Sequence, residues 1–191
     1  MKNVFAALIA LMLIVLALPV ASAAEETAEP ASHILVVYFS ATGTTRSVAE
    51  KLAEGLSADL YEIVPEQPYT AADLNYNNRK SRTSIETDDP SCRPAIAGEL
   101  PDLAAYDTLL IGYPIWWGDV PRIVSNFVEK VDLTGKTMAV FFTSGSSGLG
   151  SSMKHLEEQA AAGTWLEGKR FTPRSTVEEL LAWTASLGIE P

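Results

Sequence analysis

The chain has 191 residues, with 14 basic against 24 acidic side chains and a net charge of −10. Hydrophobic residues make up 47% of it, which is enough to build the core of one folded domain. The acidic balance excludes nucleic acid as an expected partner, because phosphate contacts need basic side chains. Solubility explains such acidity, and a basic protein partner is the alternative explanation. The single cysteine, Cys92, excludes an internal disulfide and is interpreted as an ordinary thiol in an exposed loop.

The first 23 residues have the layout of a secretory signal peptide. One lysine precedes an apolar stretch at residues 4–18, and Ala21 and Ala23 supply the small side chains of an Ala-x-Ala cleavage site. The stretch is shorter than the roughly 20 residues of a membrane-spanning helix. We therefore expect cleavage after Ala23, export to the bacterial periplasm or the extracellular space, and no stable membrane insertion of the mature protein. An uncleaved amino-terminal anchor is the alternative.

Residues 24–32 are polar and contain a proline, which predicts a flexible linker to one domain at residues 33–191. In that domain, apolar runs alternate with segments of helical period. The expected strands are residues 33–39, 58–64, 107–114, 136–145 and 164–171, the last being the weakest. The expected helices are residues 45–56, 120–131, 151–162 and 176–188, with one more starting at Thr70, where Asp73 resembles a cap. This alternation predicts an α/β fold with a parallel sheet covered on both faces.

Parallel sheets of this kind bind ligands outside the carboxyl ends of their strands. The first strand is followed by the hydroxyl-rich stretch "SATGTT", which opens a helix. Free N–H groups at a helix start, a glycine and several hydroxyls can hold a phosphate without any Lys or Arg, although an ordinary Ser/Thr helix cap has the same composition. The nucleotide triphosphate loop and the dinucleotide fingerprint are excluded, because their lysine and their further glycines are missing. The candidate phosphate-binding residues are Ser40, Ala41, Thr42, Gly43, Thr44 and Thr45.

Two more loops follow the third and fourth strands. In "YPIWWGD", a flat aromatic ligand would explain the two tryptophans, and the alternative is that one folds back onto the domain while the other rests on the surface. The composition of "TSGSSGLGSS" suits a linker or a backbone packed along the edge of something flat. Together the three loops predict a site for a phosphorylated planar heterocycle. The candidate residues of these two loops are Pro114, Ile115, Trp116, Trp117, Gly118, Ser144, Gly145, Ser146, Gly148 and Gly150.

These motifs resemble the flavodoxin family, and specifically its NAD(P)H-reductase-type branch. The stretch "ILVVYFSATGTTRSVAEKLAE" is similar to the family's first strand, phosphate loop and first helix, and "YDTLLIGYPIWWGDVPRIVSNFVE" to its third strand, flavin loop and next helix. "RPAI" resembles the segment before that strand. The resemblance implies a flavodoxin-like three-layer sandwich, a five-stranded parallel sheet in the order 2-1-3-4-5, and bound FMN. It assigns residues 40–45 to the FMN phosphate, 114–118 to the isoalloxazine ring and 144–150 to the ring's other edge.

Redox chemistry would then belong to the flavin, and the protein would tune it. No catalytic side chain and no metal site are expected, and His33 and His155 are interpreted as structural. The leading hypothesis is an FMN-binding redox protein that transfers electrons between a partner protein or small-molecule donor and an acceptor. The alternatives are an FMN-dependent oxidoreductase that reduces quinones or other small acceptors, and a flavin-free binding domain that keeps the fold. The predicted leader departs from the family's familiar cytoplasmic carriers.

Overall fold

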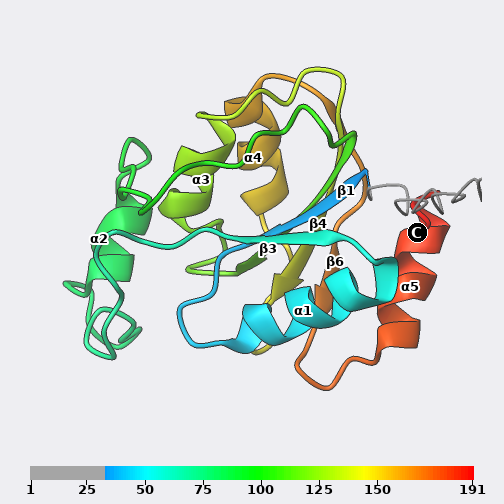
Figure 1. Cartoon of the computed structure of the whole chain (residues 1–191). Coiled ribbons are helices and arrows are strands. Elements are labelled where there is room, and N and C mark those ends of the chain that lie inside the picture. The colour runs from blue at the N-terminus through cyan, green and yellow to red at the C-terminus, as the bar shows by residue number, and fades with distance from the viewer. Residues whose placement is uncertain (1–32) are drawn as a thin grey trace, which may run out of the picture. The chain divides into compact units, whose positions relative to one another are not determined.

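The computed structural model describes residues 33–191, in which a parallel sheet lies between two layers of helices (Figure 1). The strands are β1 (Ile34–Tyr38), β2 (Asp59–Glu62), β3 (Thr108–Pro114), β4 (Thr137–Thr143), β5 (Thr164–Trp165) and β6 (Lys169–Phe171). The helices are α1 (Thr44–Leu56), α2 (Arg82–Asp88), α3 (Arg122–Val128), α4 (Ser152–Ala160) and α5 (Val177–Ser186). The predicted signal peptide and linker lie outside the described residues. Within the described range, no helix is both long enough and apolar enough to cross a bilayer.

The sheet has the predicted order, β2-β1-β3-β4-β5, with all of these pairs parallel. The α/β three-layer sandwich expected from the sequence is therefore confirmed. One detail differs, because the expected fifth strand is split. Its first half, β5, pairs with the beginning of β4, and its second half, β6, pairs with the end of β4. Gly168 lies at the break, where a Cβ atom would approach the Val140 carbonyl oxygen to 3.1 Å.

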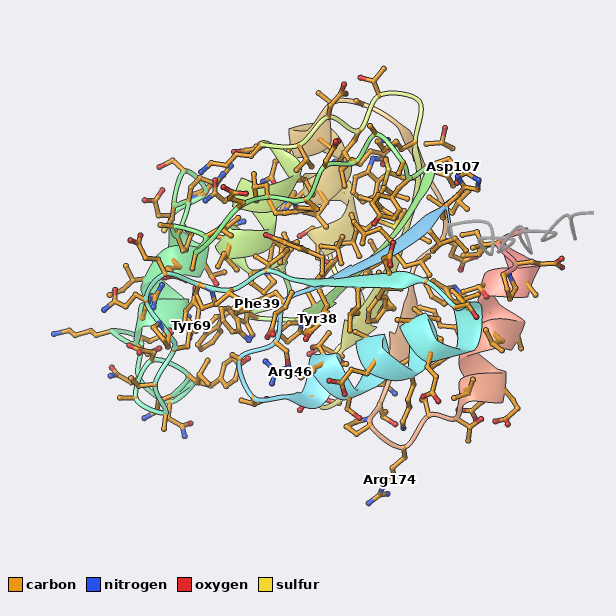
Figure 2. The ribbon with its side chains drawn as sticks, viewed as in Figure 1. Tyr38, Phe39, Arg46, Tyr69, Asp107 and Arg174 are labelled. Carbon is orange, nitrogen blue, oxygen red and sulfur yellow. The ribbon has the colours of Figure 1, made fainter. Side chains whose placement is uncertain are left out.

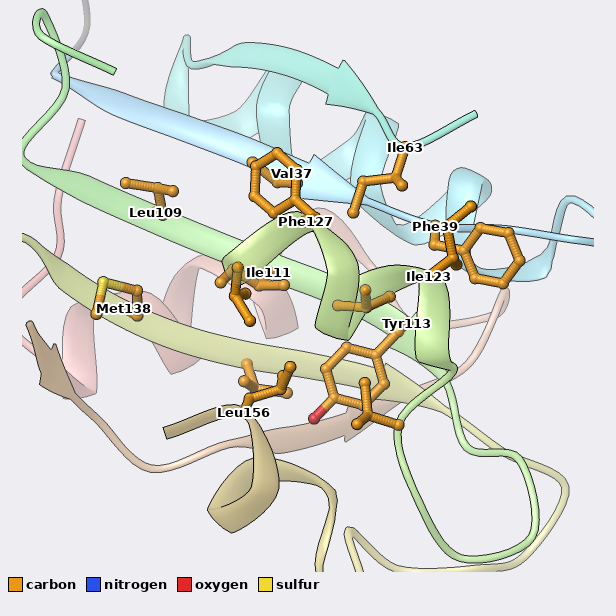
Figure 3. Packing of buried hydrophobic residues seen from close by; sticks show 14 of the residues in the cluster. Val37, Phe39, Ile63, Leu109, Ile111, Tyr113, Ile123, Phe127, Met138 and Leu156 are labelled. Atoms are coloured by element: carbon orange, nitrogen blue, oxygen red, sulfur yellow. The ribbon is translucent and has the colours of Figure 1, made fainter. Parts of the chain in front are cut away.

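The continuous apolar runs of the strands are explained by two cores, one on each face of the sheet. Alternate side chains of a strand point to opposite faces, so Val37 packs toward α3 and α4, whereas Val36 packs toward α1 and α5. Figure 3 shows the first of these cores, with Phe127 of α3 and Leu156 of α4 covering the strands. Side chains buried on both faces fix the register of the central strands, because a one-residue slip would exchange the two faces.

The polar segment between β2 and β3 does not fold as predicted. Thr70 and Asp73 form the expected reciprocal hydrogen bonds, with Thr70 N–H donating to Asp73 Oδ2 at 2.8 Å and Asp73 N–H donating to Thr70 Oγ1 at 3.3 Å. The chain then makes only a turn at residues 71–74, so the helix expected to start at Thr70 is wrong. The helix of this segment is α2 instead. It stands away from the main helical layers at the end of the sheet toward which the strands point (Figure 1).

Gly112 in β3 offers a test of how tightly the second core is packed. A Cβ atom there would lie 2.1 Å from Phe141 Cζ, so the ring of Phe141 occupies the space of the missing side chain. We expect Gly112→Ala to lower the free energy of unfolding by about 1–3 kcal/mol, because overpacking forces side chains off their rotamers. Urea unfolding measures this change. The double variant Gly112→Ala/Phe141→Leu should recover part of the loss, and an equal loss in both would contradict this account.

Candidate functional site

A pocket of about 370 Å³ opens at the carboxyl ends of β1, β3 and β4. The three loops that the sequence predicted to form one site contribute most of its wall. The pocket is lined by Ser40, Ala41, Thr42, Thr44, Thr45, Leu74, Tyr76, Pro114, Ile115, Trp116, Thr143, Ser144 and Gly145. Of the predicted residues, Gly43, Trp117, Gly118, Ser146, Gly148 and Gly150 lie outside this lining. None of the lining side chains is charged, so the wall is neutral.

The loop after β1 has the chemistry of an anion cradle. Gly43 takes the left-handed conformation (φ 83°) as the N-cap of α1, and no side chain caps this helix, so the interpretation as an ordinary Ser/Thr cap is wrong. Among the described residues, the backbone N–H groups of residues 41–46 find no hydrogen-bond acceptor. The hydroxyl of Ser40 is buried and also has no partner in this part of the chain. Unpaired donors at a helix N-terminus fit a phosphate group well.

Two contacts hold this cradle on the sheet. Thr45 Oγ1 and Thr143 Oγ1 are 2.8 Å apart in a buried hydrogen bond, which joins the start of α1 to the end of β4. Arg46 is the nearest cation in the sequence, but its guanidinium group donates to Tyr38 Oη at 3.2 Å and to Glu62 Oε1 at 2.5 Å. Figure 2 shows Arg46 beside Tyr38, at the first turn of α1. The cradle therefore relies on N–H and O–H groups and not on a basic side chain.

Trp116 folds back into the core, which is one of the two arrangements that the sequence analysis proposed for the tryptophan pair. Its side chain is 4% exposed and packs edge-to-face on Phe39 and Tyr69, with ring centroids 5.4 and 5.0 Å apart. Figure 2 shows Phe39 and Tyr69 next to each other at this end of the sheet. One side of Trp116 nevertheless lines the pocket. It is thus an aromatic wall that the core holds rigidly.

Trp117 lies at the surface, in a tight turn. Trp116 and Asp119 exchange two backbone hydrogen bonds of 3.0 and 2.9 Å, and Trp117 and Gly118 between them both have positive φ (52° and 77°). Positive φ at both central residues is typical of a type I′ turn. The Trp117 ring is 5.4 Å from that of Tyr76, and the Arg79 guanidinium group lies 4.8 Å above it. Tyr76 lines the pocket, whereas Trp117 and Arg79 lie outside its lining, so this cluster lies at the edge of the pocket.

The glycine-rich loop after β4 touches both the pocket and the turn. Its first residues, Ser144 and Gly145, line the pocket. Gly150 has φ 60°, and a Cβ atom there would lie 2.2 Å from the carbonyl oxygen of Gly118. The backbone of this loop therefore packs against the backbone of the turn, which a linker would not do. Ser146 and Gly148 are exposed, and nothing lies within 4 Å of the Cβ position of Gly148.

The segment between β2 and β3 contributes pocket residues that the sequence analysis missed. Leu74 and Tyr76 line the pocket from this segment. Tyr69 of the same segment packs against Trp116, its ring carries the Arg82 guanidinium group at 3.9 Å, and its hydroxyl donates to Glu86 Oε2 at 2.7 Å. The available signal was three aromatic or aliphatic residues in an otherwise polar stretch. Without the fold, nothing in that spacing indicates which of them faces the ligand-binding edge.

Asp119 was also missed, although it closes the turn. Its side chain is almost completely buried and accepts hydrogen bonds from Arg122 Nη1 at 3.1 Å and from His155 Nδ1 at 2.8 Å. His155, predicted to be a structural residue on an exposed helix, is half-buried and makes this contact with the site. His33 lies at the other end of β1, where its Nδ1 is 3.3 Å from the Ala105 carbonyl oxygen.

Burial raises the pKa of two tyrosines near the site and of the single cysteine. Burial raises the pKa of Tyr113, whose hydroxyl donates to Ser152 Oγ at 3.1 Å, and burial followed by the hydrogen bond to Glu86 raises the pKa of Tyr69. Both phenols stay protonated at neutral pH. Cys92 is half-buried rather than exposed, and burial raises the pKa of its thiol. In residues 33–191, no cluster of His, Cys, Asp or Glu is arranged to hold a metal ion.

A neutral cradle of unpaired donors and an aromatic wall, at the carboxyl edge of a sheet in the order 2-1-3-4-5, are typical of the class of flavodoxin-like proteins. Comparison with known families agrees. The family model described as Flavodoxin matches residues 33–187, and the chain belongs to the flavodoxin family.

Several solved structures are similar to this chain. A candidate flavoprotein from Bacteroides eggerthii DSM 20697 is 45% identical, with 82% of this chain and 98% of that chain covered and a TM-score of 0.78. A second, from Bacteroides uniformis ATCC 8492, is 41% identical, with 81% and 99% covered and a TM-score of 0.77. A flavoprotein from Lactobacillus acidophilus NCFM, solved in complex with FMN, is 25% identical, with 72% and 91% covered and a TM-score of 0.61.

A curated relative is similar over a shorter stretch. This protein, an NAD(P)H dehydrogenase (quinone) of Chromohalobacter salexigens, is 32% identical over 108 residues. The match covers 52% of this chain and 47% of the relative. The chain therefore spans about half the length of the curated relative that it matches.

The contact between Gly150 and Gly118 predicts that, of the two nearby glycines Gly148 and Gly150, only Gly150 is essential for stability. We expect Gly150→Ala to lower the free energy of unfolding by about 1–3 kcal/mol, because the new methyl group would collide with the Gly118 carbonyl in a strained, positive-φ backbone. Gly148→Ala is the matched control, since nothing lies within 4 Å of its Cβ position. Thermal or urea unfolding of both variants checks this. Equal stability of the two would show that the loop and the turn do not press on each other.

Proposed function

We propose that this chain binds FMN in the pocket at the carboxyl ends of β1, β3 and β4 and works as an FMN-dependent redox protein. The observation that carries the proposal is the neutral cradle of residues 40–46, with unpaired backbone N–H groups and the unpaired buried hydroxyl of Ser40. Such donors suit a phosphate dianion even in a protein of net charge −10. Membership of the flavodoxin family and the FMN complex of the Lactobacillus acidophilus relative support it.

In this proposal each part of the site has one task. Bound FMN supplies the redox chemistry. The N–H groups of residues 41–46 hold the phosphate, and the hydroxyls of Ser40, Thr42 and Thr44 complete the cradle. Trp116 and Tyr76 form apolar walls, which exclude water from the ring and so strengthen the electrostatic effect of nearby dipoles. Trp116 of the turn would border the ring, and Ser144 and Gly145 at the start of the loop after β4 would lie along its other edge.

A second candidate function is the reduction of quinones or other small acceptors, within the NAD(P)H-reductase-type branch of the family. Similarity to the NAD(P)H dehydrogenase (quinone) favours it. So do Tyr76 and Trp117, which are 49% and 38% exposed and offer aromatic surface to a planar substrate beside the pocket. A flavin-free binding domain is the least favoured reading, since such a domain has no use for a cradle of unpaired donors.

An absorption spectrum of the purified protein tests the proposal directly, and steady-state assays with NADH, NADPH and quinones then separate the two candidates. Flavin absorbance that survives gel filtration, with FMN as the released chromophore, is the expected result. Turnover of quinones with either nicotinamide would make the protein a reductase. Slow turnover together with fast electron exchange with a partner protein would make it a carrier. Failure to bind added FMN would overturn the proposal.

The phosphate cradle can be tested by charge. We expect Thr42→Glu to weaken FMN binding by about 1–4 kcal/mol, because its carboxylate would lie close to the phosphate in a partly dry site. Riboflavin, which has no phosphate, should lose much less affinity. Titration of flavin fluorescence measures both. Thr134→Glu, at an exposed threonine before β4, is the control and should affect neither ligand. Equal losses for the two ligands in Thr42→Glu would place the phosphate elsewhere.

We also propose that the protein is exported to the periplasm or the extracellular space, with residues 1–23 removed and residues 24–32 as a linker. The apolar stretch at residues 4–18 and the Ala-x-Ala site support this. Outside the cytoplasm NAD(P)H is scarce, which favours a redox partner protein or another small molecule as the electron donor. Mass spectrometry of protein secreted by a bacterial host should give a mature chain that begins at Ala24. Intact Met1 in the soluble cytoplasmic fraction would contradict export.

A further inference from the structure

The carboxylate of Asp119 is the point at which the turn beside the pocket is attached to the rest of the domain. Asp119 is 7% exposed. Three donors share its two oxygens: the N–H of Val120 at 2.8 Å, Arg122 Nη1 at 3.1 Å, and His155 Nδ1, which lies 2.8 Å from Oδ1 and 2.9 Å from Oδ2. Since the same residue closes the turn through its two backbone hydrogen bonds with Trp116, a shift of Asp119 shifts the turn.

Arg122 holds one side of this carboxylate in a fixed position. Its other nitrogens donate to the carbonyl oxygens of Glu86 at 3.2 Å and Thr87 at 2.8 Å, at the end of α2. The guanidinium group is buried and engaged on three sides. Arginine keeps its charge at every pH that the folded protein meets, so this contact is constant.

His155 of α4 holds the other side of the carboxylate. Its side chain is 39% exposed, so solvent protons reach it from α4. A carboxylate only accepts hydrogen bonds, so His155 carries a proton on Nδ1, and protonation of Nε2 makes the same bond charge-assisted.

Other ionisable groups also lie near this contact. Asp119 faces His155 from the turn, Arg122 of α3 binds the same carboxylate, and Tyr113 of β3, whose pKa burial raises, donates to Ser152 on α4. On α4 itself, Lys154 pairs with Glu158 at 3.6 Å. Histidine is the residue type that changes charge between about pH 5 and 8.

We infer that Asp119 is a positioning residue for the turn that borders the flavin, and that the proton on His155 sets how firmly Asp119 holds it. The inference rests on the proposed function, because it assigns these residues a task toward the bound ring. A protonated His155 strengthens its bond to Asp119 and adds a positive charge near the pocket. Flavin affinity therefore rises as pH falls from 8 to 5.5, by about fivefold for one hydrogen bond that gains a full charge.

Riboflavin is the probe for the test, because it lacks the phosphate of FMN, which itself titrates at about pH 6. The wild-type protein should bind riboflavin about fivefold more tightly at pH 5.5 than at pH 8. His155→Gln keeps a donor toward Asp119 but no titratable group, so its affinity should be independent of pH. His33→Gln is the matched control, since it removes the other histidine of the chain at the opposite edge of the sheet, and it should keep the wild-type dependence. Asp119→Asn should bind more weakly at both pH values.

A second readout needs no flavin. The tryptophan fluorescence of the apoprotein should change with pH over the same interval, because Trp116 and Trp117 lie in the turn, and His155→Gln should abolish that change. Wild-type pH dependence in His155→Gln, or its loss in His33→Gln, would overturn the inference and leave the proposed function standing. If the wild-type protein bound neither FMN nor riboflavin at any pH, the proposed function would fail and the inference with it.

Discussion

Parallel pairing of β1, β3 and β4 is the constraint on which the site depends. In a parallel sheet all carboxyl ends meet at one edge, so three loops that are far apart in the sequence must meet there. The register places Tyr38, Gly112 and Phe141 side by side in the three strands. Gly112 has no side chain, and the ring of Phe141 lies over it. The packing that fixes this register also fixes how far each loop extends beyond the sheet.

The pocket is neutral although the chain is acidic, and this division has a physical reason. A carboxylate at the wall would repel a phosphate, while a basic side chain would attract other anions as well. Backbone N–H groups at the start of α1 avoid both effects, because they are fixed in direction and selective for an acceptor that approaches closely. Arg46, the nearest cation, is occupied by Glu62. The positive charge of Arg46 therefore lies near the cradle in the sequence but is paired with Glu62.

The sequence predicted the parts whose signal is local or repeated. Strands buried on both faces give continuous apolar runs, and α1 gives a regular apolar stripe, so the parallel sheet and three ligand-facing loops could be inferred. The order of the strands came from the resemblance to the flavodoxin family. The signal failed where tertiary contacts decide. Thr70 and Asp73 form a helix-type cap with no apolar face behind it, and only a turn results. The sequence did not predict α2, because Ile85 is its single aliphatic residue and one such residue makes no apolar stripe. In the structure the side chain of Ile85 is 58% exposed.

The part of the site that could not be predicted is the set of contacts between its loops. Asp119 and His155 are 36 residues apart, and neither is unusual in its local sequence. Gly118 and Gly150 meet through backbone atoms alone, and such a contact leaves no pattern beyond a glycine. The turn at residues 116–119 keeps its shape through its own two hydrogen bonds. The contacts with α2, α3 and α4 determine the position of the turn. Because its shape is fixed, the turn moves as one unit when any of these contacts changes.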